Sequence, residues 1–459
     1  MSDTGADKVR AAVPSLVVAF AVFAVYSAFS IQQWRVFAIR SWDLGIFSEL
    51  AQSYAAFRAP IVNIKGPDYN LLGDHFHPIL VLLGPVWSVF PNPLALLIVQ
   101  NLLFALSTYV ITRLARQAIG PRTGLLVGLA YGLSWGLQGA VDAQFHEVAF
   151  AVPLLAFSAE ALYYKRFRAA ALWAAPLVFV KEDLGFTVIA IAIVVFIQGG
   201  RITGLALAGW GMLWFVIGVA IVIPLLNGEG VWQYGAGFAG QASAPLDWLA
   251  ELFALQKFET LLWLALAGAA IAFRSPIIII IVPTLLWRFL SSNSGYWGHT
   301  WHYSAVLMPV LFVAAIDGIS RARFAPPQWM RQYSAVAPAV AVTVALLLFP
   351  QAPVGAILNP TFWAPSDRAA ASEGALDAVA AGSKIESDIS LMSYLVPRGD
   401  VYWIGNANPT PDYIVVDVIA GGLPADWADV LDVARALHPE HDYAVVFDRD
   451  GYQVAELLP

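Results

Sequence analysis

Long apolar runs separated by short polar turns occupy the first three quarters of the chain. Eleven of these runs predict membrane-spanning helices, because a span needs about 17–25 mostly apolar residues. They lie at 11–30, 93–112, 123–141, 146–164, 169–180, 184–199, 202–226, 258–273, 276–290, 303–320 and 333–350. The first run is long and no small-residue cleavage site follows it, so we interpret it as a span rather than as a signal peptide.

A further apolar run, His77–Phe90, is shorter and carries Pro78 and Pro85. It ends at a Pro-Asn-Pro sequence, residues 91–93. Its length and its prolines predict an interfacial or re-entrant helix rather than a span. We therefore expect one long outer loop, residues 31–92, between the first two spans.

The pattern changes near Pro350. Beyond it, short β-type runs such as 413–418 (YIVVDV) and 443–447 (YAVVF) alternate with helical segments such as 425–437. This alternation is typical of a small α/β domain. We expect an all-α polytopic membrane domain over residues 1–350, followed by a soluble, acidic α/β domain over residues 351–459.

Composition agrees with this division. The 459 residues are 59% hydrophobic and 12% charged, with a mean hydropathy of +0.68, whereas soluble domains carry about 25% charged residues. Residues 351–459 hold 16 acidic and 5 basic residues, and nucleic acid, which requires a basic face, is excluded as a partner. The chain has no cysteine, which excludes disulfides and thiolate metal sites.

The basic residues predict the orientation. With the N-terminus in the cytoplasm, 13 of the 20 basic residues of 1–350 fall in inner loops, among them Arg113, Arg116 and Arg122. That excess satisfies the positive-inside rule. We therefore expect a multi-pass protein of the plasma (inner) membrane with an extracytoplasmic C-terminal domain. All seven histidines and 12 of the 16 acidic residues of 1–350 then fall at the outer surface.

Two polar segments lie in the long outer loop. Asp43 follows Trp42 just beyond the first span, where it is either a solvated cap or a carboxylate able to take a proton from a hydroxyl. Asp74, His75 and His77 precede the Pro78 helix. They form either a polar interfacial turn or half of a metal site.

Three further polar segments lie in later outer turns. Charges at membrane depth are costly unless they face a cavity. Each segment therefore has two interpretations: a purely structural one, as a helix cap, a tight turn or a snorkelling side chain, and a functional one. A zinc-protease motif is excluded because position 150, which would need a second histidine, is Phe150. The candidate ligand-binding residues of these segments are Asp142, His146, Glu147, Lys181, Glu182, Arg288, His299, His302 and Tyr303.

A divalent metal is one candidate cofactor. A site built from imidazole and carboxylate suits zinc, manganese or another borderline ion better than calcium. The residues that could form it are Asp74, His77, His146 and Glu147.

Several segments together resemble a known group of proteins. A first span, a long outer loop with an Asp, and an amphipathic helix opening with His-Pro resemble the GT-C membrane glycosyltransferases. More narrowly, the chain resembles a family of bacterial and archaeal polytopic membrane proteins of that clan. The segments that carry this resemblance are SWDLGIFSEL, GDHFHPILVLLGPVW, FHEVAFAVPLLAF, KEDLGF, HYSAVLMP, LVPRGDVYWIG and PDYIVVD. They cover most of residues 35–320 and part of the tail.

The resemblance implies a GT-C-like fold and transfer of a sugar from a polyprenyl phosphate to a cell-envelope glycan or glycolipid. It also implies that Asp43 is the general base; Glu49 and Asp74 are the nearest acidic companions. Direct displacement of the phosphate would invert the anomeric carbon. Arg288, Lys181, His299 and His302 are candidates to bind the lipid phosphate, because anions pair with cationic donors.

Two other classes of protein compete with this interpretation. A lipid or solute transporter or flippase also gathers charges in the membrane, but typically near the midplane and often with inverted repeats. A histidine-ligated metal or redox protein would use the same histidines, but the chain has no haem-attachment motif. The clustering of charges at one surface favours the transferase.

Overall fold

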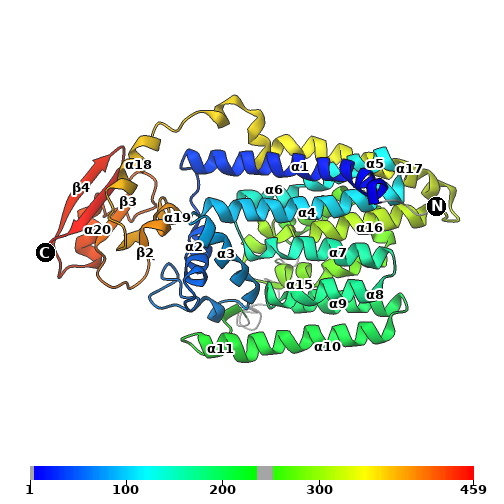
Figure 1. Cartoon of the computed structure of the whole chain (residues 1–459), viewed down its shortest axis with the longest axis horizontal. Helices are drawn as coiled ribbons and strands as arrows, with labels where there is room; N and C mark the ends of the chain where they lie inside the picture. The colour runs from blue at the N-terminus through cyan, green and yellow to red at the C-terminus, as the bar shows by residue number, and fades with distance from the viewer. Residues whose placement is uncertain (1–4, 235–250, 252) are drawn as a thin grey trace.

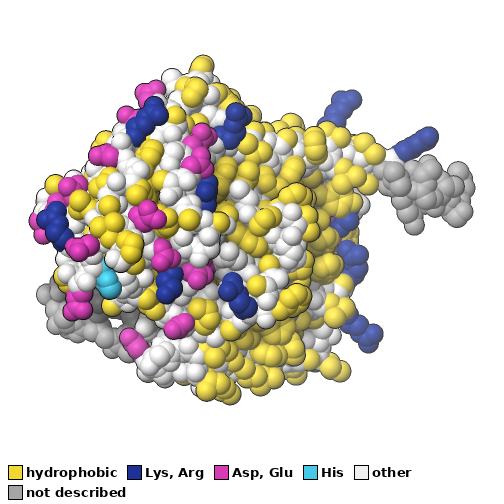
Figure 2. All heavy atoms as spheres, turned by 60° about the vertical axis from the view of Figure 1, so that its left-hand side comes forward, with side chains coloured by type: hydrophobic (Ala, Val, Ile, Leu, Met, Phe, Trp, Pro, Cys, Tyr) yellow, Lys and Arg dark blue, Asp and Glu magenta, His cyan; other side chains and the backbone are white. Residues whose placement is uncertain are grey.

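The structure, a computed structural model, describes residues 5–234, 251 and 253–459. Long helices run side by side, and a domain with a β-sheet lies at one end of this bundle (Figure 1). The chain begins near the opposite end of the bundle (Figure 1). Hydrophobic residues dominate the surface of the bundle, whereas acidic side chains gather over the C-terminal domain (Figure 2).

Helices make up the part of the chain before Pro350. The α-helices described there are α1 (Gly5–Arg35), α2 (Trp42–Ala55), α3 (Leu83–Val89), α4 (Leu94–Ile119), α5 (Pro121–Gly132), α6 (Trp135–Asp142), α7 (Ala151–Tyr163), α8 (Phe167–Ala174), α9 (Leu184–Ile197), α10 (Arg201–Ile217), α11 (Ile223–Leu226), α14 (Leu255–Ala267), α15 (Val282–Leu290), α16 (Leu307–Ala322) and α17 (Gln328–Leu348). Short 3-10 turns extend several of them, including η2 (Pro78–Leu82), η3 (Glu147–Ala149), η7 (Pro276–Ile281) and η9 (His302–Ser304).

Each of the eleven expected spans contains helical structure. Among the described residues, six helical segments are long and apolar enough to cross a membrane: Arg10–Arg35, Leu94–Ile119, Pro121–Asp142, Arg201–Leu226, His302–Ala322 and Gln328–Gln351. The other expected spans contain shorter helices, several of them interrupted by proline, which removes a backbone donor and ends regular helix.

The run expected to be interfacial is also a short helix. Residues Pro78–Val89 form η2 and α3, below the length of a full span. In Figure 1, α3 lies beside α2 at the end of the bundle that meets the C-terminal domain.

The C-terminal domain is built on a five-stranded sheet, in the order β2-β1-β3-β5-β4. Its strands are β1 (Ser383–Ser387), β2 (Gly399–Trp403), β3 (Tyr413–Asp417), β4 (Tyr443–Arg449) and β5 (Tyr452–Leu457). β1 pairs in parallel with β2 and β3, whereas β5 is antiparallel to both β3 and β4. Helices α18 (Ala369–Asp377), α19 (Met392–Leu395) and α20 (Val430–Leu437) accompany the sheet. The α/β prediction for the tail is confirmed.

One predicted helix is shorter than expected. The sequence pattern placed a helix over 425–437, but α20 begins at Val430. Asp429 caps it, because its side chain accepts a hydrogen bond from Asp432 N at 2.9 Å. Apolar residues of α20, among them Val430 and Val433, pack in one cluster with Ile414 and Val416 on one face of the sheet.

Candidate functional site

The site begins at helix α2. Ser41 is its N-cap, and the Ser41 hydroxyl accepts a hydrogen bond from Leu44 N at 3.0 Å, which sets the start of the helix at Trp42. Asp43 therefore lies in the first turn, where the helix dipole favours a carboxylate. Leu44 and Leu50 are fully buried, while the Asp43 side chain is 40% exposed.

Asp43 lines a cavity of about 1170 Å³. Part of the wall is polar and comes from α2, the loop before η2, the turn before α7, the turn before α9 and the loop before α16. The titratable residues of this wall include Asp43, Lys65, Asp74, His75, His77, His146, Glu147, Lys181, Glu182, Asp183, His302 and Tyr303. The structure thus brings together ten of the thirteen site residues predicted from sequence.

Another part of the cavity wall is apolar. Phe186, Ile189, Ala190 and Ile193 line it and share one face of α9, because they recur at helical spacing. Residues of α15, including Val282, Leu286 and Leu290, also line it. Since α9 starts directly after the polar turn 181–183, the cavity extends from charged groups along the apolar helices.

The Asp43 carboxylate lies beside two histidines. His146 Nε2 is 3.4 Å from Asp43 Oδ2, and the His146 ring stacks on His302 with a centroid separation of 3.6 Å. Burial opposes ionisation of Asp43, but attraction to the His146 imidazolium outweighs it and lowers the pKa of the Asp43 carboxyl.

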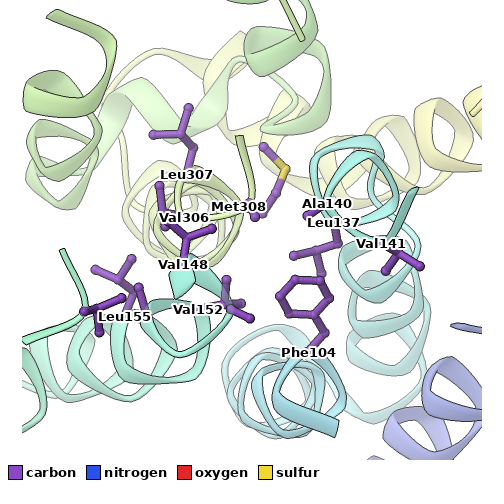
Figure 3. Close-up of a cluster of buried hydrophobic side chains, with 14 of the residues drawn as sticks. Phe104, Leu137, Ala140, Val141, Val148, Val152, Leu155, Val306, Leu307 and Met308 are labelled. Carbon is purple, nitrogen blue, oxygen red and sulfur yellow. The ribbon is translucent and has the colours of Figure 1, made fainter. Parts of the chain in front are cut away.

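A tightly packed apolar cluster fixes these two histidines. Val148 and Val152 follow His146 in the chain, and Val306, Leu307 and Met308 follow His302. Figure 3 shows these side chains gathered in one buried cluster, together with Phe104 and Leu137. Because close-packed cores resist displacement, the turns that carry both histidines are held in a fixed relation.

Two buried ion pairs occupy the neighbouring wall. Lys181 Nζ lies 2.9 Å from Glu147 Oε1, and His75 Nδ1 lies 2.7 Å from Glu182 Oε1. Glu182 also accepts a hydrogen bond from Phe76 N at 3.0 Å. Burial alone would raise the pKa of the Glu182 carboxyl, but His75 lowers it to about 2. Lys181, a candidate to bind the lipid phosphate, is thus already paired with an acidic side chain.

Two charged cavity residues were not predicted from the sequence. Lys65 pairs with Asp74 at 3.0 Å and lies 5.2 Å from the centre of the Trp42 ring. Asp183 is the N-cap residue of α9, but its side chain makes no capping bond. Its Oδ1 is buried without a hydrogen-bond partner among the described residues, and burial raises the pKa of Asp183 to about 6. The Lys-Glu-Asp run was the only signal of Asp183.

The expected metal set is not assembled. Among the described residues, no group of three or more His, Asp or Glu side chains is arranged to hold a metal ion. The carboxylates of Asp74 and Glu147 are each paired with a lysine instead. These four residues therefore do not fit a shared metal ion in this arrangement.

Three predicted binding residues lie outside the cavity wall. Arg288 is fully buried and donates to Tyr296 O at 2.8 Å, to Gly298 O at 2.6 Å and to the Ser304 hydroxyl at 3.2 Å. Its guanidinium therefore holds the loop before α16 and does not line the cavity.

The remaining two have other partners. His299 stacks on Trp263 with a centroid separation of 4.7 Å and lies 3.5 Å from Glu259. Asp142 accepts a hydrogen bond from Gln33 at 3.3 Å. Neither residue lines the cavity.

The helical bundle, its cavity and the C-terminal sheet are those of a polytopic membrane protein, and one solved structure shows that the fold is GT-C-like. The structure of ArnT from Cupriavidus metallidurans bound to undecaprenyl phosphate aligns with a TM-score of 0.54 at 12% identity, covering 94% of this chain and 97% of that chain. Residues 34–454 match the family described as "Predicted membrane protein (DUF2079)", and the chain belongs to that family.

Two other comparisons add little. The apo oligosaccharyltransferase of Archaeoglobus fulgidus aligns with a TM-score of 0.41 at 11% identity, covering 87% of this chain and 69% of that chain. This similarity is too low to carry an argument. No curated protein sequence matches the chain.

Proposed function

We propose that the protein is a membrane glycosyltransferase that moves a sugar from a polyprenyl phosphate to an extracytoplasmic acceptor, with inversion of the anomeric carbon. One observation carries the proposal: the Asp43 carboxylate lines a large cavity that has both a charged wall and an apolar wall. A lipid-linked sugar has the same two parts, because its phosphate and sugar are polar and its prenyl chain is apolar.

Asp43 would act as the general base. Its oxygen takes the proton of the acceptor hydroxyl while that hydroxyl's oxygen bonds to the anomeric carbon. The bond from the anomeric carbon to the phosphate oxygen breaks at the same time, and the polyprenyl phosphate leaves with the bonding electrons. Attack from the face opposite the phosphate inverts the carbon. The His146 contact keeps Asp43 ionised at neutral pH, as a base must be.

The charged wall would hold the donor's polar part. Lys181 and His75 are basic side chains, although each already has a carboxylate partner. We assign the phosphate to the neighbourhood of Lys181 and His302 because both line the cavity together with Asp43. The unpaired Asp183 carboxylate oxygen would accept a hydrogen bond from a sugar hydroxyl.

The apolar wall would hold the prenyl chain. Ile193, Leu286 and Leu290 line the cavity and are 46%, 53% and 52% exposed, so their side chains remain accessible to a lipid. The fold shared with an undecaprenyl-phosphate-bound enzyme supports a lipid-linked donor. We place the site at the outer face of the plasma membrane, from the charge rule applied to the sequence.

The test is transfer of a labelled sugar in lipid nanodiscs. Purified full-length protein is supplied with undecaprenyl phosphates carrying different labelled sugars and with an envelope glycolipid extract. Asp43→Asn keeps the size of the side chain but removes the basic oxygen, so turnover should fall about 10²–10⁴-fold. Asp68→Asn, an exposed carboxylate of the same loop, is the matched control and should retain full turnover.

Either of two results would count against the proposal. If the Asp43→Asn protein, checked for folding by gel filtration, transfers sugar at the wild-type rate, Asp43 is not the base. If the wild type transfers none of the supplied sugars but, reconstituted in sealed vesicles, moves the labelled lipid across the bilayer, the protein is a flippase.

A further inference from the structure

Helix α2 lies between the bundle and the C-terminal domain (Figure 1). Three contacts join the C-terminal domain to the start of this helix. The Ser393 hydroxyl of α19 donates to Ser41 O at 2.9 Å, and the rings of Trp42 and Trp403 lie 5.4 Å apart. The third contact is at Gly45, where an added Cβ would lie 3.4 Å from the Met392 side chain. The residues on either side of Asp43 are thus held by a domain more than 300 residues later in the chain.

A buried carboxylate joins the middle of α2 to the same domain. Glu49 is 4% exposed; its Oε1 accepts a hydrogen bond from Val401 N of β2 at 3.0 Å, and its Oε2 accepts one from Ile64 N at 3.1 Å. Each oxygen therefore bonds a different segment, and Glu49 itself belongs to a third. Its neighbours Asp400 and Tyr402 bring no positive charge.

Apolar packing continues across the same contact. Leu44, Leu50 and Ile64 belong to one buried cluster with Leu395 and Val401 of the C-terminal domain. Beside it, Tyr394 stacks on Trp34 at the end of α1, with a centroid separation of 4.1 Å. A shared core of this kind makes a rigid contact rather than a loose linker.

We propose that the C-terminal domain is a positioning part of the catalytic site, and that Glu49 is the positioning residue that couples it to Asp43. Glu49 lies outside the cavity wall and acts through α2. The role given to Asp43 rests on the proposed function, whereas the coupling between Glu49, β2 and α2 does not.

The Glu49→Gln variant separates this role from simple space filling. Glutamine has nearly the same shape but only one acceptor oxygen, so its NH₂ group would face the N–H of either Val401 or Ile64. A donor facing a donor cannot bond, and one of the two segments must move away. The matched control is Glu373→Gln, which makes the same change at an exposed position of α18.

The experiment measures hydrogen exchange and transfer on full-length protein in nanodiscs. In Glu49→Gln, amide exchange over residues 44–53 should become at least tenfold faster, and exchange in α4 should stay unchanged. Ser393→Ala should speed exchange at the start of α2. In the transfer assay, kcat of Glu49→Gln should fall about tenfold with KM for the lipid-linked donor unchanged, because Asp43 is displaced while the cavity is intact. Glu373→Gln should match the wild type in both measurements.

Two outcomes would overturn the proposal. Unchanged exchange over α2 in both Glu49→Gln and Ser393→Ala would show that the domain does not position the helix. Faster exchange with unchanged kcat would show docking without any effect on catalysis. If the wild type has no transferase activity, the exchange data still decide the coupling, so that failure is separate from failure of the proposed function. Faster exchange in α4 as well would mean global loosening and would also count against a positioning role.

Discussion

The interaction between His146 and Asp43 has a measurable consequence for pH dependence. In the His146→Gln variant, the imidazolium 3.4 Å from the Asp43 carboxylate is replaced by a neutral amide that can still donate a hydrogen bond. Because the positive charge lowers the pKa of Asp43, its removal must raise that pKa. A base works only when unprotonated. The acidic limb of the pH–rate profile for sugar transfer should therefore move to higher pH in this variant.

The size of the shift follows from the distance. Two unit charges 3.4 Å apart attract by ~2 kcal/mol at an effective dielectric constant of about 40. The Asp43 side chain is 40% exposed, and solvent screening reduces this to ~1 kcal/mol. Since one pKa unit corresponds to ~1.4 kcal/mol, we expect the limb to move up by about one pH unit.

The assay is the initial rate of sugar transfer in nanodiscs between pH 3.5 and 7, a range set by the ordinary carboxyl pKa of about 4. Asp68→Asn serves as a control for general effects of charge on the outer loop. Protein incubated at each pH and returned to pH 7 must regain its activity, which excludes acid unfolding. An acidic limb at the wild-type position in His146→Gln would refute an electrostatic role for His146.

Three further predictions follow from the geometry. Arg288→Ala removes the donor to two buried carbonyls and one hydroxyl, so thermal unfolding should show a destabilisation of about 2–4 kcal/mol with KM for the donor lipid unchanged. A raised KM without destabilisation would contradict the structural role of Arg288 described above. Chelation by EDTA should leave transfer unchanged, since the described carboxylates and histidines do not form a metal site, and a loss of activity restored by zinc or manganese would contradict this. The chain has no cysteine, so the introduced cysteine of an Arg116→Cys variant should react with an impermeant maleimide only after the membrane is opened. Labelling in sealed cells would show that the orientation is the reverse of the predicted one.

The hydropathy pattern predicted the helical part of the fold well, because a span must be apolar along its whole length. Every expected span contains helical structure, and the β-type runs of the tail indicated a sheet, which the structure has over residues 383–457. The pattern could not predict how the helices shorter than a full span are arranged in the bundle, because their arrangement depends on proline breaks and on packing against neighbouring helices.

The site was predicted in part. Residue type and outer location were enough to select His146, Glu147, Lys181 and His302, all of which line the cavity. Residue type and location did not predict where the Arg288 side chain points, because the direction of a long side chain depends on which carbonyls it reaches. Asp183 was overlooked because a carboxylate before a helix usually caps it, and only the structure shows that its side chain makes no capping bond.

The contact between Glu49 and Val401 also bears on how the protein is made. These two residues are 352 positions apart, and a ribosome adds about 5–20 residues per second. Helix α2 is therefore synthesised tens of seconds before the strand that completes its packing. During that interval Glu49 has one of its two partners, and apolar residues of α2 such as Leu44 and Leu50 lack part of their cover. The chain can reach a fully packed α2 only after its last domain has folded, so a truncated or stalled copy would leave this helix unpacked and open to envelope proteases.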